Sequence, residues 1–98
     1  MTTLQHCIEL LTEATPFIRS KFGVTVLRIF GSVARGEDGA GSDIDIYVEM
    51  PPKALRVVEL KLYLQTLLGR AVDVVRSHSH LDPFLRNEIQ RDGITVIA

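Results

Sequence analysis

The sequence predicts an α+β protein in two layers, in which helices pack against a mixed β-sheet. Helical and strand-like patterns of apolar residues alternate along the chain, and glycines or prolines separate them. Their predicted order is helix, strand, strand, helix, strand, helix, strand. The chain has 98 residues, a common size for one independently folding unit, so we predict a single domain over residues 1–98.

The N-terminal region is predicted to form two helices. Apolar residues recur with the helical period over residues 4–14, and a threonine at the start can cap this helix. Pro16 lacks a backbone N–H, so it is expected to break the helix, with Thr15 capping a second short helix. Gly23 is expected to end that second helix.

Shorter patterns predict the remaining elements. Residues 24–30 (VTVLRIF) are apolar on both faces, which is typical of an inner strand. Residues 32–37 can form one helical turn before a glycine-rich loop. Strands are further predicted over residues 43–50, 71–75 and 94–98, and helices over residues 53–68 and 81–91.

Composition narrows the functional classes. The formal net charge of −1 gives no bulk attraction to nucleic acid or to an anionic membrane, so neither is predicted as a partner. No apolar run is long enough to span a bilayer, and the first ten residues lack the basic start of a secretory signal. The single cysteine, Cys7, cannot form an internal disulfide, which fits a reducing cytoplasm. We therefore expect a cytoplasmic location.

Two aspartates stand one residue apart in the alternating strand of residues 43–50, DIDIYVEM. Asp43 and Asp45 therefore share one face, about 6.6 Å apart along the strand. At an approach of about 4 Å their carboxylates repel by roughly 4 kcal/mol when the effective dielectric constant is about 20. A bound Mg²⁺ would remove this repulsion. The alternative is that Asp43 begins the strand and Asp45 faces water.

Two further features accompany this pair. Gly31 and Ser32 directly follow the predicted buried strand, where a glycine lets a phosphate approach the backbone N–H groups and the serine hydroxyl. The alternative is an ordinary turn with Ser32 as a helix N-cap, and Arg35 is the only cation nearby. Asp73 lies in an otherwise apolar strand, where a buried carboxylate needs a partner. A strand-end aspartate in water explains Asp73 equally well.

Gly31-Ser32, ten residues, and then Asp43-x-Asp45 resemble the signature of the polymerase-β-like nucleotidyltransferase superfamily. The fuller stretch GSVARGEDGAGSDIDIYV is similar to the minimal nucleotidyltransferases, or MNT proteins, which are often encoded beside a HEPN-domain protein. The segment LLGRAVDVV supplies the third carboxylate, Asp73, and the resemblance covers almost the whole chain. It implies the polymerase-β-like nucleotidyltransferase fold.

The resemblance also implies roles for the acidic residues. Asp43 and Asp45 would bind Mg²⁺, and Asp73 would either bind a second Mg²⁺ or act as a base towards the acceptor hydroxyl. Two metal ions can stabilise both the attacking and the leaving oxygen of such a transfer. ATP would be the substrate, AMP would be joined to the acceptor, and pyrophosphate would leave.

The outer phosphates of the nucleotide would be held by Gly31 and Ser32, again by resemblance. Arg35 would help to neutralise phosphate, or it would instead pair with Glu37 at the surface. No role is assigned to five further residues of cationic or metal-binding type, namely Arg70, Arg76, His78, His80 and Arg86. The two histidines are predicted to lie in a solvated loop.

The family precedent implies transfer of AMP to a hydroxyl, expected to be a tyrosine, of a HEPN toxin, so that the chain would act as an antitoxin. A second hypothesis is a non-catalytic antitoxin that masks its HEPN partner. The helix over residues 53–68 has an apolar arc wider than one core face needs, although deep burial would explain it equally. A third hypothesis is nucleotidyl transfer to a small molecule such as an antibiotic. Homo-oligomers and hetero-oligomers both remain open.

Overall fold

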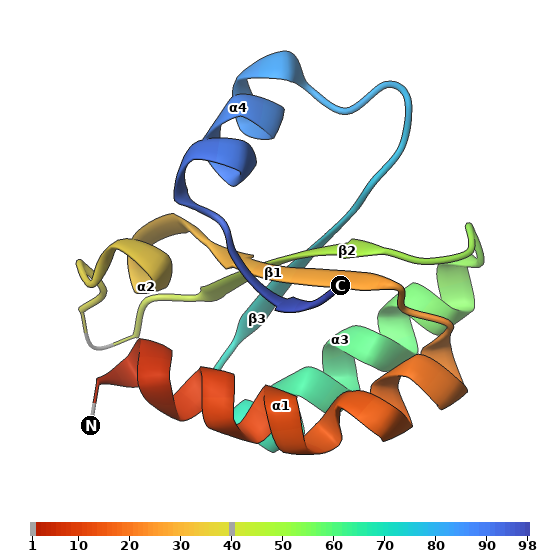
Figure 1. Cartoon of the computed structure of the whole chain (residues 1–98), viewed down its shortest axis with the longest axis horizontal. Coiled ribbons are helices and arrows are strands. Elements are labelled where there is room, and N and C mark those ends of the chain that lie inside the picture. The colour runs from red at the N-terminus through yellow and green to blue at the C-terminus, as the bar shows by residue number, and fades with distance from the viewer. Residues whose placement is uncertain (1, 40) are drawn as a thin grey trace.

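The structure is a computed structural model that describes residues 2–39 and 41–98. Within these residues, four helices surround a four-stranded sheet (Figure 1). In chain order the elements are α1 (Thr3–Phe22), β1 (Val26–Phe30), α2 (Gly31–Arg35), β2 (Ile44–Glu49), α3 (Ala54–Leu68), β3 (Val72–Arg76), α4 (Pro83–Asp92) and β4 (Ile94–Ile97). This order confirms the prediction except near the N-terminus, where one helix replaces two.

The strands lie in the order β3-β2-β1-β4. β1 runs antiparallel to β2 and to β4, whereas β2 and β3 run parallel, with α3 as the crossover between them. The predicted mixed sheet is therefore confirmed. β1 is an inner strand, as its two apolar faces predicted, and β3 lies at an edge.

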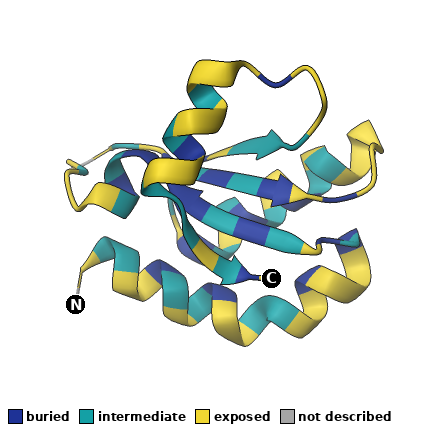
Figure 2. Cartoon of the chain, turned by 45° about the horizontal axis from the view of Figure 1, so that its top comes forward, coloured by how far each residue is buried: buried dark blue, intermediate teal, exposed yellow. Residues whose placement is uncertain are grey.

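Two apolar clusters hold helices on opposite faces of the sheet. α1 and α3 cover one face, and α4 crosses the other (Figure 1). The larger cluster joins α1 and α3 to the sheet through buried side chains such as Leu11, Ile46 and Leu64, each worth about 1.5–3 kcal/mol on leaving water. The smaller cluster fixes α4 through Ile89 and Phe30. Figure 2 shows buried positions along the strands and exposed positions on the outer sides of the helices.

A single helix, α1, spans the region in which two helices were predicted, and Thr2 caps it through its side-chain hydroxyl. Pro16 lies inside this helix, where a proline costs about 3 kcal/mol. The predicted break is wrong because Leu11 and Ile18, on either side of the proline, pack into the same core and offset that cost. Thr15 caps no second helix, and its hydroxyl donates to the Leu11 carbonyl oxygen instead.

The predicted alternation of β2 decides which groups face α4. Ile44, Ile46 and Val48 are fully buried in the larger cluster. Asp45 and Tyr47 therefore point to the opposite face, where Tyr47 joins the smaller cluster beneath α4. None of the described helices is both long and apolar enough to cross a membrane.

Candidate active site

Three aspartates gather at one end of the sheet, where β1 ends and β2 and β3 begin. Asp45 on β2 is paired with Phe30 on β1 and with Asp73 on β3. Asp43 directly precedes β2, two residues before Asp45, and alternation places it on the same face. Paired residues on adjacent strands point to one face, so the structure brings the three predicted carboxylates together.

The turn after β1 is shaped around Asp45. Gly31 begins α2 with a φ of +75°, in the left-handed region that favours glycine. A Cβ atom at this position would collide with the carboxylate oxygen Oδ2 of Asp45. A glycine is therefore what lets the backbone pass this carboxylate. Ser32 lies inside α2, and Phe30 occupies the N-cap position without a side-chain hydrogen bond, so the alternative of Ser32 as N-cap is wrong.

Negative charge accumulates at this end of the sheet. Burial raises the pKa of the Asp45 carboxyl above its ordinary value. The carboxylates of Asp73, Asp43 and Glu88 raise the same pKa further, and Arg35 acts in the opposite direction. Burial and the carboxylates together outweigh the arginine, so the pKa of Asp45 is raised, and a bound cation would stabilise its ionised form.

The carboxylates of the site fit a magnesium ion whose coordination shell is completed by the substrate. Among residues 2–39 and 41–98, no group of three or more His, Cys, Asp or Glu side chains forms a metal cage by itself. Mg²⁺ commonly takes only one or two protein carboxylates, and waters and substrate phosphates fill its other positions. Asp43 and Asp45 supply hard oxygen ligands of this kind. Burial and then the neighbouring carboxylates raise the pKa of Asp45, and a cation would offset both effects.

Arg35 connects α2 to α4. Its Nε lies 3.1 Å from Glu37 Oε2, so the predicted surface pairing with Glu37 is present. Its Nη1 lies 3.1 Å from Asp92 Oδ2 and 3.6 Å from Glu88 Oε1, both on α4. Carboxylates thus surround the guanidinium, and contact with a nucleotide phosphate would require part of this network to open.

Asp73 and the two histidines lie in solvent. Asp73 is exposed, not buried, because β3 is an edge strand whose α4-side face is only partly covered. Its carboxylate therefore needs no protein partner and stands open to solvent beside Asp45. His78 and His80 are exposed in the connection between β3 and α4, as predicted.

Sequence patterns did not reveal Arg70, which fixes the loop leading to Asp43. Its Nη2 donates to the Ser42 carbonyl oxygen at 2.6 Å, and its Nη1 donates to Asp38 Oδ2 at 3.2 Å. It also donates to the Thr3 hydroxyl at 3.4 Å, which ties the loop to the start of α1. No local pattern links an arginine to a carbonyl 28 residues away, so only the fold could identify this role.

Comparison with known proteins bears on the chemistry of this site. The family model described as Polymerase beta, Nucleotidyltransferase matches residues 12–98. The chain belongs to this nucleotidyltransferase family. Protein adenylyltransferase MntA of Thermococcus cleftensis is 41% identical over 81 residues, which cover 81% of this chain and 82% of MntA. The Methanocaldococcus jannaschii protein named "Putative protein adenylyltransferase MJ1217" is 36% identical over 98 residues, which cover 98% of this chain and 100% of the relative.

Solved structures share the fold. One described as "putative minimal nucleotidyltransferase" has a TM-score of 0.75 and 36% identity, covering 96% of this chain and 95% of the other. A Shewanella oneidensis complex of a tri-AMPylated HEPN toxin with an MNT antitoxin has a TM-score of 0.67 and 21% identity, covering 95% of this chain and 71% of the matched one. The polymerase-β-like α+β fold and the resemblance to MNT proteins are confirmed, and the chain is a nucleotidyltransferase.

Replacing Arg70 with lysine is expected to lower the rate of nucleotidyl transfer roughly tenfold or more, because small misplacements at an active site are costly. A lysine keeps the charge but cannot bridge Ser42 and Asp38 with one planar group, so the loop before Asp43 loses its fixed position. Initial rates should be compared with those of Arg56→Lys, a variant of an exposed arginine on α3. Equal rates in the two variants would contradict a positioning role for Arg70.

Proposed function

We propose that this nucleotidyltransferase transfers AMP from ATP to a hydroxyl of a HEPN-domain partner, with Mg²⁺ as cofactor, and thereby acts as that partner's antitoxin. The observation that carries the proposal is the packing of Gly31 against the Asp45 carboxylate, beside Asp43 and Asp73. It sets a turn suited to phosphates next to carboxylates suited to a metal ion. Relatives named as protein adenylyltransferases support AMP as the transferred group and a protein as acceptor.

Each residue of the site has a proposed task. Gly31 lets the backbone N–H groups of the turn approach the outer phosphates, and the Ser32 hydroxyl donates to them. Asp43 and Asp45 hold Mg²⁺, which when bound neutralises charge on the triphosphate and on the leaving pyrophosphate. Asp73 stands exposed beside Asp45, where it can accept the proton of the acceptor hydroxyl or hold a second ion.

The proposed reaction forms one bond and breaks another at the α-phosphorus of ATP. The acceptor oxygen attacks this phosphorus, the bond to the oxygen that bridges to the β-phosphate breaks, and pyrophosphate leaves. The proton of the acceptor hydroxyl passes to Asp73 or to solvent. Tyrosine is the proposed acceptor because a phenol, with a pKa of about 10, loses its proton more readily than an aliphatic hydroxyl. The tri-AMPylated HEPN toxin of the Shewanella complex supports a HEPN protein as the target.

Intact-mass spectrometry tests this proposal. A HEPN-domain protein from the same organism would be incubated with this chain, ATP and Mg²⁺, beside a reaction with the Asp43→Asn/Asp45→Asn double variant and one with a chelator. We expect the partner to gain the mass of one or more AMP units only with the unmodified chain and the metal ion. If the partner gains no mass while the double variant still neutralises it, the catalytic proposal is wrong and masking is favoured.

A second candidate function, masking of a HEPN partner, is favoured by one specific observation on α3. Leu55, Val58 and Leu62 are 71%, 54% and 57% exposed, on a helix whose opposite side is buried through Leu60 and Leu64. The apolar arc of this helix is therefore wider than the core needs, and deep burial does not explain it. An exposed apolar stripe of this kind suits a protein partner, and catalysis and masking can coexist.

Replacing Leu55 and Leu62 with glutamine is expected to weaken binding of the HEPN partner at least about tenfold, since buried apolar anchors dominate interface energetics. Both side chains are exposed in the free chain, so the melting temperature should change little. Binding would be measured by isothermal titration calorimetry, with Lys61→Gln as the control that introduces the same residue at an exposed polar position of α3 outside the stripe. Unchanged affinity in the double variant would exclude α3 as the docking surface.

A further inference from the structure

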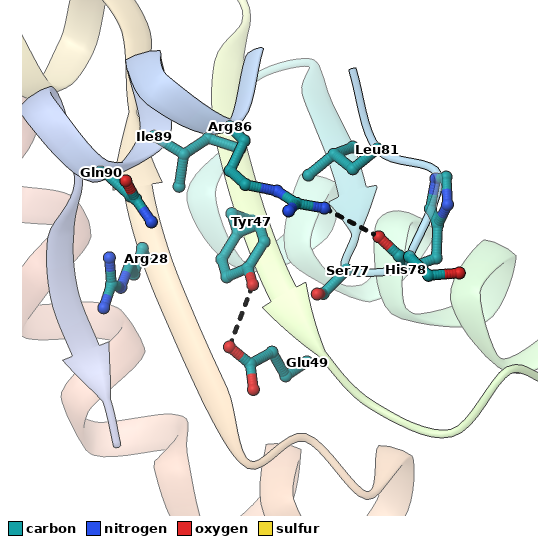
Figure 3. Close-up of a pocket in the computed structure, with 10 residues that line it drawn as sticks. Arg28, Tyr47, Glu49, Ser77, His78, Leu81, Arg86, Ile89 and Gln90 are labelled. Atoms are coloured by element: carbon teal, nitrogen blue, oxygen red, sulfur yellow. Dashed lines mark hydrogen bonds between the residues drawn. The ribbon is translucent and has the colours of Figure 1, made fainter. Parts of the chain in front are cut away.

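A pocket lies on the α4 side of the sheet, the side to which the three aspartates also point. It has a volume of about 480 Å³, within the range of small-molecule sites. Figure 3 shows its walls: Arg28, Tyr47 and Glu49 come from the sheet, Arg86, Ile89 and Gln90 come from α4, and the remainder comes from the connection between β3 and α4.

The helix α4 separates this pocket from the acidic site. Glu88 and Asp92 lie on one flank of α4, where both form ion pairs with Arg35. Arg86 and Gln90 line the pocket, and the helical spacing of about 100° per residue places them on the opposite flank. The pocket therefore shares no lining residue with the proposed catalytic centre.

Arg28, a lining residue from β1, has a side-chain N–H without a hydrogen-bond acceptor in the described part of the chain. Its Nε is buried and has no partner among the described residues. A Cβ at Gly93 would lie 3.3 Å from the Arg28 Cδ and would collide with the Ile89 carbonyl oxygen, so the junction of α4 and β4 packs closely on the arginine stem. A buried N–H that lacks an acceptor costs free energy, so the Nε of Arg28 marks an unmet need for an acceptor beside the pocket.

The pocket carries more positive than negative charge. Among the residues that the structure describes, neither Arg28 nor Arg86 forms an ion pair with a carboxylate, and Arg86 makes only a 3.4 Å hydrogen bond to the His78 carbonyl oxygen. Glu49 is the one carboxylate in the lining, and its Oε2 already accepts a hydrogen bond from the Tyr47 hydroxyl at 3.0 Å. The lining thus carries two guanidinium groups and one carboxylate, and the guanidinium groups lie on opposite sides of the Tyr47 ring (Figure 3).

We propose that this pocket binds a small organic anion through Arg28 and Arg86. A carboxylate or a phosphate of the ligand meets the two guanidinium groups, which favour both anions through charge-assisted hydrogen bonds. A flat or apolar portion of the ligand lies against the Tyr47 ring and Leu81, which together with Ile89 form the apolar part of the lining. The site is distinct from the nucleotide site and does not depend on the activity proposed above.

Benzoate and phenyl phosphate are suitable probes, with neutral benzamide as the control for the ring alone. Backbone amide shifts would be followed by NMR during titration of the metal-free chain. We expect saturable shifts at residues 77–81 with at least one anion and none with benzamide. Arg28→Gln and Arg86→Gln should each weaken this binding about tenfold, because each removes a charge-assisted hydrogen bond. Lys61→Gln, which removes a charge from α3, should leave it unchanged.

The two probes show which acidic group the pocket prefers in its ligand. Tighter binding of benzoate indicates a carboxylate, and tighter binding of phenyl phosphate indicates a phosphate. Phenyl phosphate bound at the turn after β1 would instead shift the amide resonances of Ser32 and Val33. This pattern distinguishes binding at the turn from binding in the pocket. No saturable shift at residues 77–81 with either anion, or shifts that persist undiminished in both arginine variants, would overturn the proposal. Arg86 is exposed, so its replacement keeps the test decisive even if Arg28→Gln disturbs folding.

Discussion

Replacing Asp45 with asparagine is expected to lower AMP transfer at least about a hundredfold, as loss of a key charged or polar group at a transfer site commonly does. The same change is expected to raise the melting temperature at neutral pH when metal ion and nucleotide are absent. Burial and the neighbouring carboxylates of Asp73 and Asp43 raise the pKa of Asp45, so its ionised form destabilises the folded chain. An amide of the same size removes that charge.

The pH dependence of stability follows from the direction of this shift. The folded pKa of Asp45 lies above the unfolded value, so the folded chain binds the proton more tightly. Its stabilising contribution is complete below the ordinary aspartate pKa and is lost as pH rises through the raised value. The advantage of Asp45→Asn should therefore be present at neutral pH and vanish on acidification below the ordinary aspartate range.

Scanning calorimetry across this pH range, with Glu13→Gln on α1 as a control for loss of an exposed carboxylate, would check the stability effect. At subsaturating Mg²⁺, transfer by the unmodified chain should also fall on acidification at a pH above that of an ordinary aspartate, because protonated Asp45 binds a metal ion poorly. An asparagine variant that melts lower than the unmodified chain at every pH would contradict this electrostatic account.

Replacing Gly31 with alanine is expected to abolish transfer and to destabilise the chain by more than about 2 kcal/mol. The left-handed backbone costs a non-glycine residue roughly 1–2 kcal/mol, and the new methyl group must in addition displace the Asp45 carboxylate. Because the displaced group is the proposed metal ligand, activity should fall further than stability alone explains.

Gly69 provides a matched control. Its φ of +70° nearly equals that of Gly31, but a Cβ there meets no heavy atom within 4 Å. Gly69→Ala should therefore cost about 1–2 kcal/mol of backbone strain and leave transfer unchanged. Urea unfolding and initial rates would be measured for both variants. Equal losses of activity in the two would show that the contact between Gly31 and Asp45 has no catalytic importance.

Local patterns predicted much of the site. Alternation placed Asp43 and Asp45 on one face, because it depends only on neighbouring residues. The glycine after the buried strand was expected to admit a phosphate, whereas its contact with the Asp45 carboxylate arises only when β1 and β2 pair. The position of Asp73 beside Asp45 depends on the parallel register of β2 and β3. No local pattern sets that register, and the sequence indicated a place for Asp73 in the site only through the family resemblance.

Long-range packing explains what the sequence did not predict. Pro16 stays inside α1 because tertiary burial on both sides outweighs a local penalty. Asp73 is exposed because β3 is an edge strand, which its apolar composition did not reveal. The roles of Arg70 and of the pocket around Arg28 arise only when distant segments meet, at the loop before Asp43 and beneath α4.

The central claim is that the acidic end of β2 holds a metal ion together with the nucleotide. A crystal grown with a non-hydrolysable ATP analogue and Mn²⁺ in place of Mg²⁺ tests it most directly, because anomalous scattering locates the manganese. We predict an anomalous peak in contact with the carboxylates of Asp43 and Asp45, and the outer phosphates of the analogue at Gly31 and Ser32. Manganese and analogue bound elsewhere, with these carboxylates free of metal, would contradict the account.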